Sequence, residues 1–490
     1  MDSNKTLSLS PKILLEIEEA LNYPRFSEIS IGATLTDDLM VSLYHAGRVW
    51  NWRARVKNFL RYRFQRLYQP SFGTKDLSEI KGRIVFTWQF DRADLKALVL
   101  PLVANYSHED SVVLGALSSM QAQLADQTSF VSWNDFSILD MKAWRMWRRE
   151  FDRCLPMWRY RLQQVLAKHA VPPYVAEFLL SRLHLQTKRI IAANQFLNIV
   201  RPKMIVTECA RSGLASCLVL AARKKSIPTI TMIHGAMEPY PSYGFAPIIT
   251  NYVCCWGEIH KNNFMAFGTN QEQLIVTGCH SMTRAIEIKQ DAARLKIGLP
   301  VNLPVVLLAT SPIKLEDRKK YTSAFCVAMT NLPGLSAIIR LHPAENIADY
   351  RALVDEFPKV KFLPNLSMSR DESLAAVDLV VSHESSFGID ALIKRKLLII
   401  LNVLNTPLKV GKELVELAGC PAVSSPGELE SVIREIFASK NYRKVLRDKA
   451  DQYVHQYCNS FGHEAVNNVC GLIDYAINSD TQKIELSLRA

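Results

Sequence analysis

The chain has 490 residues with a net charge of +12; 48% of the residues are hydrophobic and 22% are charged. This length exceeds one ordinary hydrophobic core, which predicts two domains, and the composition excludes a disordered chain. No apolar run reaches the roughly 18–20 residues of a membrane span, and the N-terminal residues lack the apolar core of a signal peptide, so we expect a cytoplasmic protein. The ten cysteines contain no C-x-x-C pair, which favours reduced, packed thiols over disulfides or a zinc site.

Residues 1–78 predict a helical N-terminal extension. Within it, residues 48–66 hold seven cations and no acid, interleaved with aromatic residues, and residues 144–161 again mix arginine with tryptophan. Such segments suit an anionic interface, so we expect peripheral contact with the inner face of a membrane; the alternative is a set of solvated helix faces whose aromatics pack inward. No helix-turn-helix, zinc-finger or aromatic RNA-binding signature accompanies the charge, so we expect no nucleic-acid partner.

Residues 79–283 predict a first α/β domain. A helix that starts at residue 93 is expected to end at about residue 100 because Pro101 follows it. A helical insertion fills about residues 138–200, with expected breaks at Pro156 and at Pro172-Pro173. Apolar segments typical of buried strands occur at 84–88, 111–115, 129–132, 204–207, 227–233 and 274–276, and within 249–256.

Residues 284–303 are first charged and then proline-bearing, which predicts a linker. Residues 304–440 predict a second α/β domain, and residues 441–490 predict C-terminal helices. Strands that alternate with helices form parallel sheets covered on both faces, so the fold class is doubly wound α/β in both domains. Two such domains leave a cleft at the carboxyl ends of their strands. The strands expected in the second domain are 305–309, 337–341, 360–363, 378–381 and 397–401.

Two strand ends of the second domain have residues suited to a phosphate. The strand at 378–381 runs into Ser-His-Glu-Ser-Ser at 382–386, and a short helix follows. Hydroxyl groups and free backbone N–H groups at a helix start can hold an anion. The strand at 337–341 ends in Arg-Leu-His-Pro at 340–343. Together these ends predict an enzyme with a nucleotide-linked substrate.

The candidate donor-binding residues all lie at or just after strand ends of the second domain. Asp390 stands one helical turn after Ser386, where it could reach a ribose hydroxyl, and the loop after strand 305–309 supplies two further hydroxyls. For the serines the structural alternative is an ordinary helix cap, and for the histidine before the proline it is a packed side chain. The residues are Thr310, Ser311, Arg340, His342, Pro343, Ser382, His383, Glu384, Ser385, Ser386 and Asp390.

These residues resemble a known family. The layout is similar to the GT-B glycosyltransferases, in which two Rossmann-like domains face each other. Among them the chain resembles bacterial surface-polysaccharide enzymes, namely sialyl- and Kdo-transferases and CDP-glycerol glycerophosphotransferases, through the motifs His342-Pro343 and Ser385-Ser386. The resemblance covers residues 200–402 in detail and 80–200 only as architecture. In the first domain it is carried by His234-Gly235, Tyr243, Pro247, Trp256-Gly257-Glu258, Gly268 and Val276-Thr277-Gly278.

The resemblance implies that residues 79–283 bind the acceptor, that residues 304–440 bind the nucleotide donor, and that His342 and the paired serines contact the donor phosphate. Without a metal, hydrogen-bond donors and cations must stabilise the departing phosphate. His342 could also act as a general acid if it is protonated. The acceptor hydroxyl needs a base, for which Glu208 and His234, at neighbouring strand ends of the first domain, are the candidates.

The resemblance therefore implies an inverting glycosyltransferase that moves a sugar, or a polyol phosphate, from a nucleotide-activated donor, preferably CMP- or CDP-linked, to a surface glycan or lipid-linked acceptor. No Asp-x-Asp motif or ligand cluster predicts a metal, no P-loop or G-x-S-x-G motif occurs, and we expect no cofactor besides the nucleotide-sugar substrate. One alternative is a UDP-N-acetylglucosamine 2-epimerase-like isomerase on the same plan. Another is a non-catalytic glycan-assembly protein on a transferase scaffold.

Overall fold

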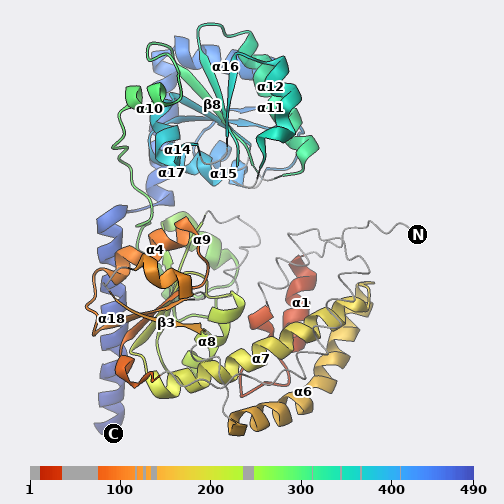
Figure 1. Cartoon of the computed structure of the whole chain (residues 1–490), viewed down its shortest axis with the longest axis vertical. Helices are drawn as coiled ribbons and strands as arrows, with labels where there is room; N and C mark the ends of the chain where they lie inside the picture. Colours follow the sequence, from red (N-terminus) through yellow and green to blue (C-terminus); the bar gives the residue numbers. More distant parts are fainter. Residues whose placement is uncertain are drawn as a thin grey trace.

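The computed structural model folds the chain into two α/β domains that lie one above the other along the longest axis (Figure 1). Several sequence candidates lie outside the described residues, namely segment 48–66, Tyr243, Pro247, Pro343 and Glu384. The structure describes residues 11–35, 76–115, 118–124, 128–133, 141–235, 248–311, 313–342, 345–364, 367–383, 385–408 and 410–489.

The first domain is built on a seven-stranded parallel sheet with the order β3-β2-β1-β4-β5-β6-β7. Strand β1 pairs with β2 on one side and with β4 on the other, with Ile84 opposite both Ser111 and Met204. Nearly every strand residue is buried, as expected for a sheet covered on both faces. The strands are β1 Ile84–Trp88, β2 Ser111–Gly115, β3 Ser129–Ser132, β4 Met204–Thr207, β5 Thr229–Met232, β6 Tyr252–Cys255 and β7 Leu274–Val276.

Helices cover both faces of this sheet (Figure 1). Helix α4 packs on one face with the long C-terminal helix α18, and α6, α7 and α8 share a core on the other face with the N-terminal helix α1. The last helix of the domain, α9, follows β6. The bounds are α1 Pro11–Leu21, α4 Ala93–Val103, α6 Met141–Lys168, α7 Tyr174–Val200, α8 Gly213–Lys224, α9 Glu258–Ala266 and α18 Gly462–Arg489.

Two of the expected helix breaks are absent. Helix α4 continues through Pro101 to Val103, and α6 continues through Pro156 to Lys168. Proline removes one backbone donor, but both helices bury apolar side chains on each side of it, so the packing keeps them continuous. The break at 172–173 is confirmed, because this pair separates α6 from α7.

The second domain has a six-stranded parallel sheet with the order β10-β9-β8-β11-β12-β13, so the predicted doubly wound fold class is confirmed in both halves. Its strands are β8 Val305–Ala309, β9 Ser336–Arg340, β10 Val360–Leu363, β11 Leu379–Ser382, β12 Leu397–Leu401 and β13 Ala422–Val423. Its helices are α10 Gln290–Lys296, α11 Leu315–Thr330, α12 Arg351–Glu356, α13 Arg370–Ala376, α14 Ser386–Ile393, α15 Val410–Glu416, α16 Pro426–Ala438 and α17 Lys440–Tyr457.

The expected linker contains a helix of its own. Helix α10 packs against the second domain, since Arg294 donates to the carbonyl of Ala376 and forms an ion pair with Asp378 at 2.6 Å. A second crossing runs from α17, which packs on α14 and touches α9, into α18 beside the first sheet. At this crossing the N–H of Cys279 donates to the carbonyl of Ser460 at 2.9 Å. The chain therefore crosses between the two domains twice, once through the linker and once between α17 and α18.

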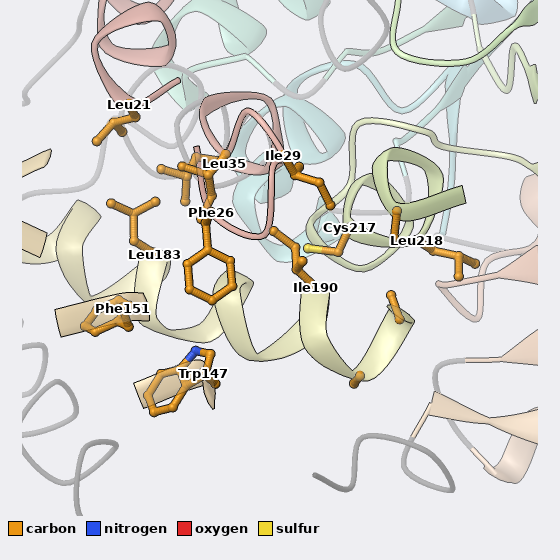
Figure 2. Close-up of a cluster of buried hydrophobic side chains, with 14 of the residues drawn as sticks. Leu21, Phe26, Ile29, Leu35, Trp147, Phe151, Leu183, Ile190, Cys217 and Leu218 are labelled. Carbon is orange, nitrogen blue, oxygen red and sulfur yellow. The ribbon is translucent and has the colours of Figure 1, made fainter. Parts of the chain in front are cut away.

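The tryptophans of α6 belong to the core of the first domain. Figure 2 shows Trp147 and Phe151 turned toward Leu183 of α7 and toward Phe26 of the N-terminal segment. The indole N–H of Trp147 donates to the hydroxyl of Thr187 at 2.9 Å. For the tryptophans and Phe151 of this helix, the inward-packing alternative is therefore correct.

Candidate active site

The candidate residues of both domains follow the carboxyl ends of strands at, or next to, the point where the strand order reverses. In the first sheet β1 lies beside β4, so Glu208 at the end of β4 faces the loop that follows β1. In the second sheet β8 lies beside β11, so Thr310 and His383 follow neighbouring strands. Doubly wound proteins bind ligands outside the carboxyl ends of such strand pairs. The topology therefore brings the residues predicted from separate segments into two groups, one in each domain.

The start of α14 is the centre of the second-domain group. Ser385 is its N-cap, and its Oγ accepts the N–H of Phe387 at 3.2 Å. Ser386 is the first helical residue, and its Oγ accepts a hydrogen bond from Nη2 of Arg370 at 3.0 Å. The first N–H groups of a helix have no partner within it and carry partial positive charge. A guanidinium, hydroxyls and helix N–H groups therefore converge at this point, a set of donors that suits an anion.

An ion pair holds Arg370 in this place. Its Nη1 lies 2.5 Å from Oδ2 of Asp390, whose side chain is buried, while the Arg370 side chain remains 49% exposed. Burial raises the pKa of Asp390 to about 6, an effect that outweighs the opposing charges of Arg370 and Lys394. Asp390, which we expected near a ribose hydroxyl, pairs with Arg370 in this structure, and this contact positions Arg370.

Arg340 adds a second guanidinium to the same neighbourhood. It ends β9, where its Nε donates to Oγ of Ser373 at 3.2 Å and its guanidinium lies 5.1 Å from the ring centroid of Phe387. Its pKa is lowered by burial and by the nearby charge of Arg370. A bound anion near these two guanidinium groups would be stabilised by the positive charge of both.

His342 follows β9 and is half-buried. Its backbone N–H donates to Oγ1 of Thr310 at 2.9 Å, and that hydroxyl in turn donates to Oε2 of Glu345 at 2.9 Å. Burial lowers the pKa of His342 more than the neighbouring Glu345 raises it. The imidazole is therefore neutral near pH 7 in this state, and the Thr310 hydroxyl is engaged in holding the loop that carries it.

His383 and its neighbours line a small enclosed space of about 20 Å³. The Nδ1 of His383 lies 3.1 Å from the carbonyl oxygen of Leu401, and its Nε2 lies 3.2 Å from the hydroxyl of Tyr321. Ser311 lines the same space and is buried. Within the described part of the chain, the Oγ of Ser382 is buried with no hydrogen-bond partner. His383 is thus fixed by its neighbours.

Sequence reasoning missed the cations that complete this group. Arg318 of α11 lies 3.3 Å from Glu345, whose Oε2 also accepts the hydroxyl of Tyr350 at 2.8 Å. Arg370 follows Ser369, which forms a capping box with Glu372. The S-x-x-E spacing of that box is visible in the sequence and predicts the helix start, but only the tertiary structure shows that Arg370 points at α14.

The first-domain group is enclosed. Glu208 is 0% exposed; its Oε2 accepts the hydroxyl of Thr87 at 2.6 Å and its Oε1 accepts the backbone N–H of Gln89. Burial raises the pKa of Glu208, although these hydrogen bonds oppose the rise. The Nδ1 of His234 lies 3.0 Å from the backbone carbonyl of Glu208, and burial lowers the pKa of this histidine. The two candidate bases are therefore neighbours, and His234, which is partly exposed, is the more accessible.

The described residues contain neither a candidate metal site nor a candidate membrane span. Among the described residues no group of three or more His, Cys, Asp or Glu side chains could hold a metal ion. None of the described helices combines the length and the apolarity needed to cross a bilayer. All ten cysteines are free thiols, which agrees with the sequence expectation.

Many solved structures are similar to this fold, among them the following three. A Listeria monocytogenes protein assigned as a UDP-N-acetylglucosamine 2-epimerase has a TM-score of 0.51 and 12% identity, covering 80% of this chain and 96% of its own. A glycosyltransferase from Rickettsia africae has a TM-score of 0.50 and 11% identity, covering 81% and 99%. A further UDP-N-acetylglucosamine 2-epimerase has a TM-score of 0.50 and 11% identity, covering 81% and 96%. No family model matches the sequence, and no curated protein is similar to it. At these identities the likeness shows the fold alone, which confirms the expected GT-B architecture.

Proposed function

We propose that the protein is a metal-independent GT-B glycosyltransferase that moves a sugar, or a polyol phosphate, from a nucleotide-activated donor to a surface glycan or lipid-linked acceptor. The observation that carries the proposal is the hydrogen bond from Arg370 to Ser386 at 3.0 Å, at the start of α14 and beside Arg340. The GT-B fold, which includes nucleotide-sugar enzymes among its solved members, supports the substrate class.

The reaction requires groups that stabilise the negative charge of the departing phosphate. When the glycosidic bond to the donor breaks, negative charge grows on the phosphate oxygens, and donors that are already in position stabilise it without reorganisation. Arg370 is held in position by Asp390, and Ser386 with the helix N–H groups supplies further hydrogen bonds. Because His342 is neutral near pH 7, we assign it a hydrogen bond to the phosphate rather than the role of a protonated general acid.

For the acceptor hydroxyl we propose His234 as the base. Its pKa is lowered by burial, so the imidazole is neutral near pH 7 and able to take a proton. Its position 3.0 Å from the carbonyl of Glu208 orients the ring through Nδ1. Glu208, which we also considered, has both carboxyl oxygens engaged inside the domain, so we assign it the support of the loop around His234.

The donor nucleotide follows from the motifs only as a preference. The His-Pro and paired-Ser motifs favour a CMP- or CDP-linked donor, whereas two proteins of the same fold are named for UDP-N-acetylglucosamine. A thermal-shift series with CMP, CDP, UDP and GDP tests this, because a ligand that binds only the folded state raises the melting temperature. We expect one nucleotide to raise it and Ser386→Ala to reduce that rise. If none of the four nucleotides raises the melting temperature, the proposal is wrong.

A second candidate function is epimerisation of a UDP-sugar, favoured by the shared fold with the two epimerases. Incubation of the protein with UDP-N-acetylglucosamine and no acceptor separates the two reactions. Formation of an epimer without acceptor would establish the isomerase and exclude the transferase. Transfer of label from a nucleotide sugar to a glycan acceptor, without epimer formation, is the result that the transferase proposal expects.

A further inference from the structure

Helix α6 has an outer face that the rest of the protein leaves exposed. Its inner face, which includes Trp147, Phe151 and Trp158, is buried against α1 and α7. In Figure 1 the helix lies at the edge of the first domain, away from the second domain. The surface discussed below, called the α6 outer face, consists of Lys142, Arg145, Met146, Arg148, Arg149, Arg153, Met157, Arg159 and Tyr160, all of them exposed.

The charge of this helix is unusually one-sided. Over its 28 residues α6 holds eight lysines and arginines and two acids, a net charge of +6, which is half of the +12 of the whole chain. Both acids already lie near arginines of the same helix, Asp152 at 4.0 Å from Arg148 and Glu150 at 3.7 Å from Arg153. The two acids offset two of the eight cations, and the remaining charge gives the face a positive potential that attracts anions.

Apolar side chains lie between these cations. Met146 is 60% exposed, Met157 is 44% exposed and Tyr160 is 58% exposed. Residues 146, 149, 153, 157 and 160 follow one another at intervals of three or four, so methionine, arginine and tyrosine form a single stripe along the helix. A polyanion in water explains the arginines but gives no reason to expose the methionines, whereas the headgroup region of a bilayer suits both.

We propose that the α6 outer face docks the protein on a membrane surface of anionic phospholipid. Guanidinium groups bind phosphate oxygens in pairs of hydrogen bonds, and Met146, Met157 and Tyr160 enter the headgroup layer beside them. The packed inner face keeps the helix attached to the domain, so the contact is peripheral. The inference adds a lipid partner to the proposed function, but its evidence and its test need no nucleotide.

The test is cosedimentation of the full chain with phosphatidylcholine vesicles that contain or lack phosphatidylglycerol. We expect binding only with the anionic lipid and weaker binding at high salt. The variant Arg145→Gln/Arg149→Gln/Arg159→Gln is expected to lower the partition coefficient about 100-fold, since each cation near an anionic surface contributes roughly a fivefold factor. The matched control removes three exposed lysines of the second domain, Lys319→Gln/Lys359→Gln/Lys440→Gln, and is expected to bind as the wild type does.

Met146→Ser/Met157→Ser tests the apolar part and is expected to lower binding about fivefold, with the loss retained at high salt. Three results would overturn the proposal: full binding by the arginine variant, equal binding to both vesicle types, or an equal loss in the lysine control. Stronger competition by heparin or single-stranded DNA than by anionic vesicles would assign the face to another polyanion and also overturn it. The nucleotide-induced thermal shift, measured on the same variants, shows separately whether the proposed function holds.

Discussion

The two groups at the strand-order reversals differ in how their polar side chains are used. In the first domain the carboxyl of Glu208 is completely buried and accepts hydrogen bonds from Thr87 and Gln89. In the second domain Arg370 is half-exposed and shares its donors between Asp390 and Ser386. The same topological position thus contains a closed network in one domain and an open set of cations in the other.

The comparison of Glu208 with Asp390 shows which property distinguishes a binding site from a structural network. A perturbed pKa alone does not, because burial raises the pKa of Glu208 and of Asp390 alike. The two carboxyl groups differ in their partners: Glu208 has buried, uncharged partners, whereas the partner of Asp390 is the half-exposed guanidinium of Arg370. We therefore expect loss of the buried contacts around Glu208 to affect stability, and loss of Arg370 to affect nucleotide binding.

The largest effect is expected beside the first group, where Arg211 of the β4–α8 loop contacts both carboxyl oxygens of Glu18 at 2.6 and 2.7 Å. Arg211→Met leaves a buried carboxylate without its partner, so we expect the free energy of unfolding to fall by about 3–5 kcal/mol in urea denaturation. Nucleotide affinity should not change in the protein that remains folded.

The matched control for this prediction is the double variant Glu18→Leu/Arg211→Met. Removing both charges replaces the ion pair with apolar side chains, so most of the lost stability should return. A double variant as unstable as Arg211→Met would show that shape, not charge, decides the packing of the N-terminal helix α1.

Arg370→Ala tests the second group. Each hydrogen bond to a charged group contributes about 1.5–3 kcal/mol, so we expect calorimetry to show roughly a 10- to 100-fold loss of affinity for the preferred nucleotide. The control is Arg351→Ala, which removes an exposed arginine at the start of α12. Equal affinity in both variants would mean that the start of α14 does not receive the phosphate.

Asp390→Asn is expected to change the pH dependence of stability. The pKa of Asp390 is raised to about 6 in the folded protein, so the folded state binds a proton more tightly than the unfolded state does. Its contribution to stability is complete below the unfolded pKa of about 3.9 and is lost as the pH rises through 6. Relative to Asp390→Asn, the free energy of unfolding of the wild type should fall by about 2 kcal/mol between pH 4 and pH 6.5. Parallel stability curves for the two proteins would contradict this assignment.

Glu208→Gln is expected to have the smallest effect. The amide retains an oxygen for Gln89 but places an NH₂ group near Thr87, whose hydroxyl can turn to accept, so we expect a loss of about 1–2 kcal/mol in the free energy of unfolding. Transferase activity of the folded protein should stay close to that of the wild type. Loss of activity with unchanged stability would make Glu208, and not His234, the base.

Much of the fold could be predicted from the sequence. Eight strands have the predicted bounds, since a buried parallel strand needs a mostly apolar segment; they are β1, β2, β3, β4, β7, β8, β10 and β12. The helices that pass Pro101 and Pro156 could not be predicted, because local sequence shows the lost hydrogen bond but not the packing that compensates for it. Helix α10 in the linker was missed because its burial depends on α13.

The candidate site was predictable only in part. Ser385 and Ser386 could be located because a strand, a pair of hydroxyls and a helix follow one another along the chain. Arg370 lies 16 residues before Ser386, on a different helix, and no sequence spacing links the two. Asp390 was selected as a ligand for its position on α14, but its partner could not be identified without the packing of α13.

The sequence by itself determined the alternation of strands and helices, and hence two parallel sheets whose strand ends carry hydroxyl, imidazole and guanidinium groups. Which of these groups face the solvent, and which pair with other groups inside the protein, depends on the tertiary structure. The reason is physical: periodicity along the chain sets the backbone hydrogen bonding and the buried face. The partner of a charged side chain, in contrast, is a residue that folding brings close. Burying a charge without such a partner costs much free energy, so the partner determines whether the charged group can be buried.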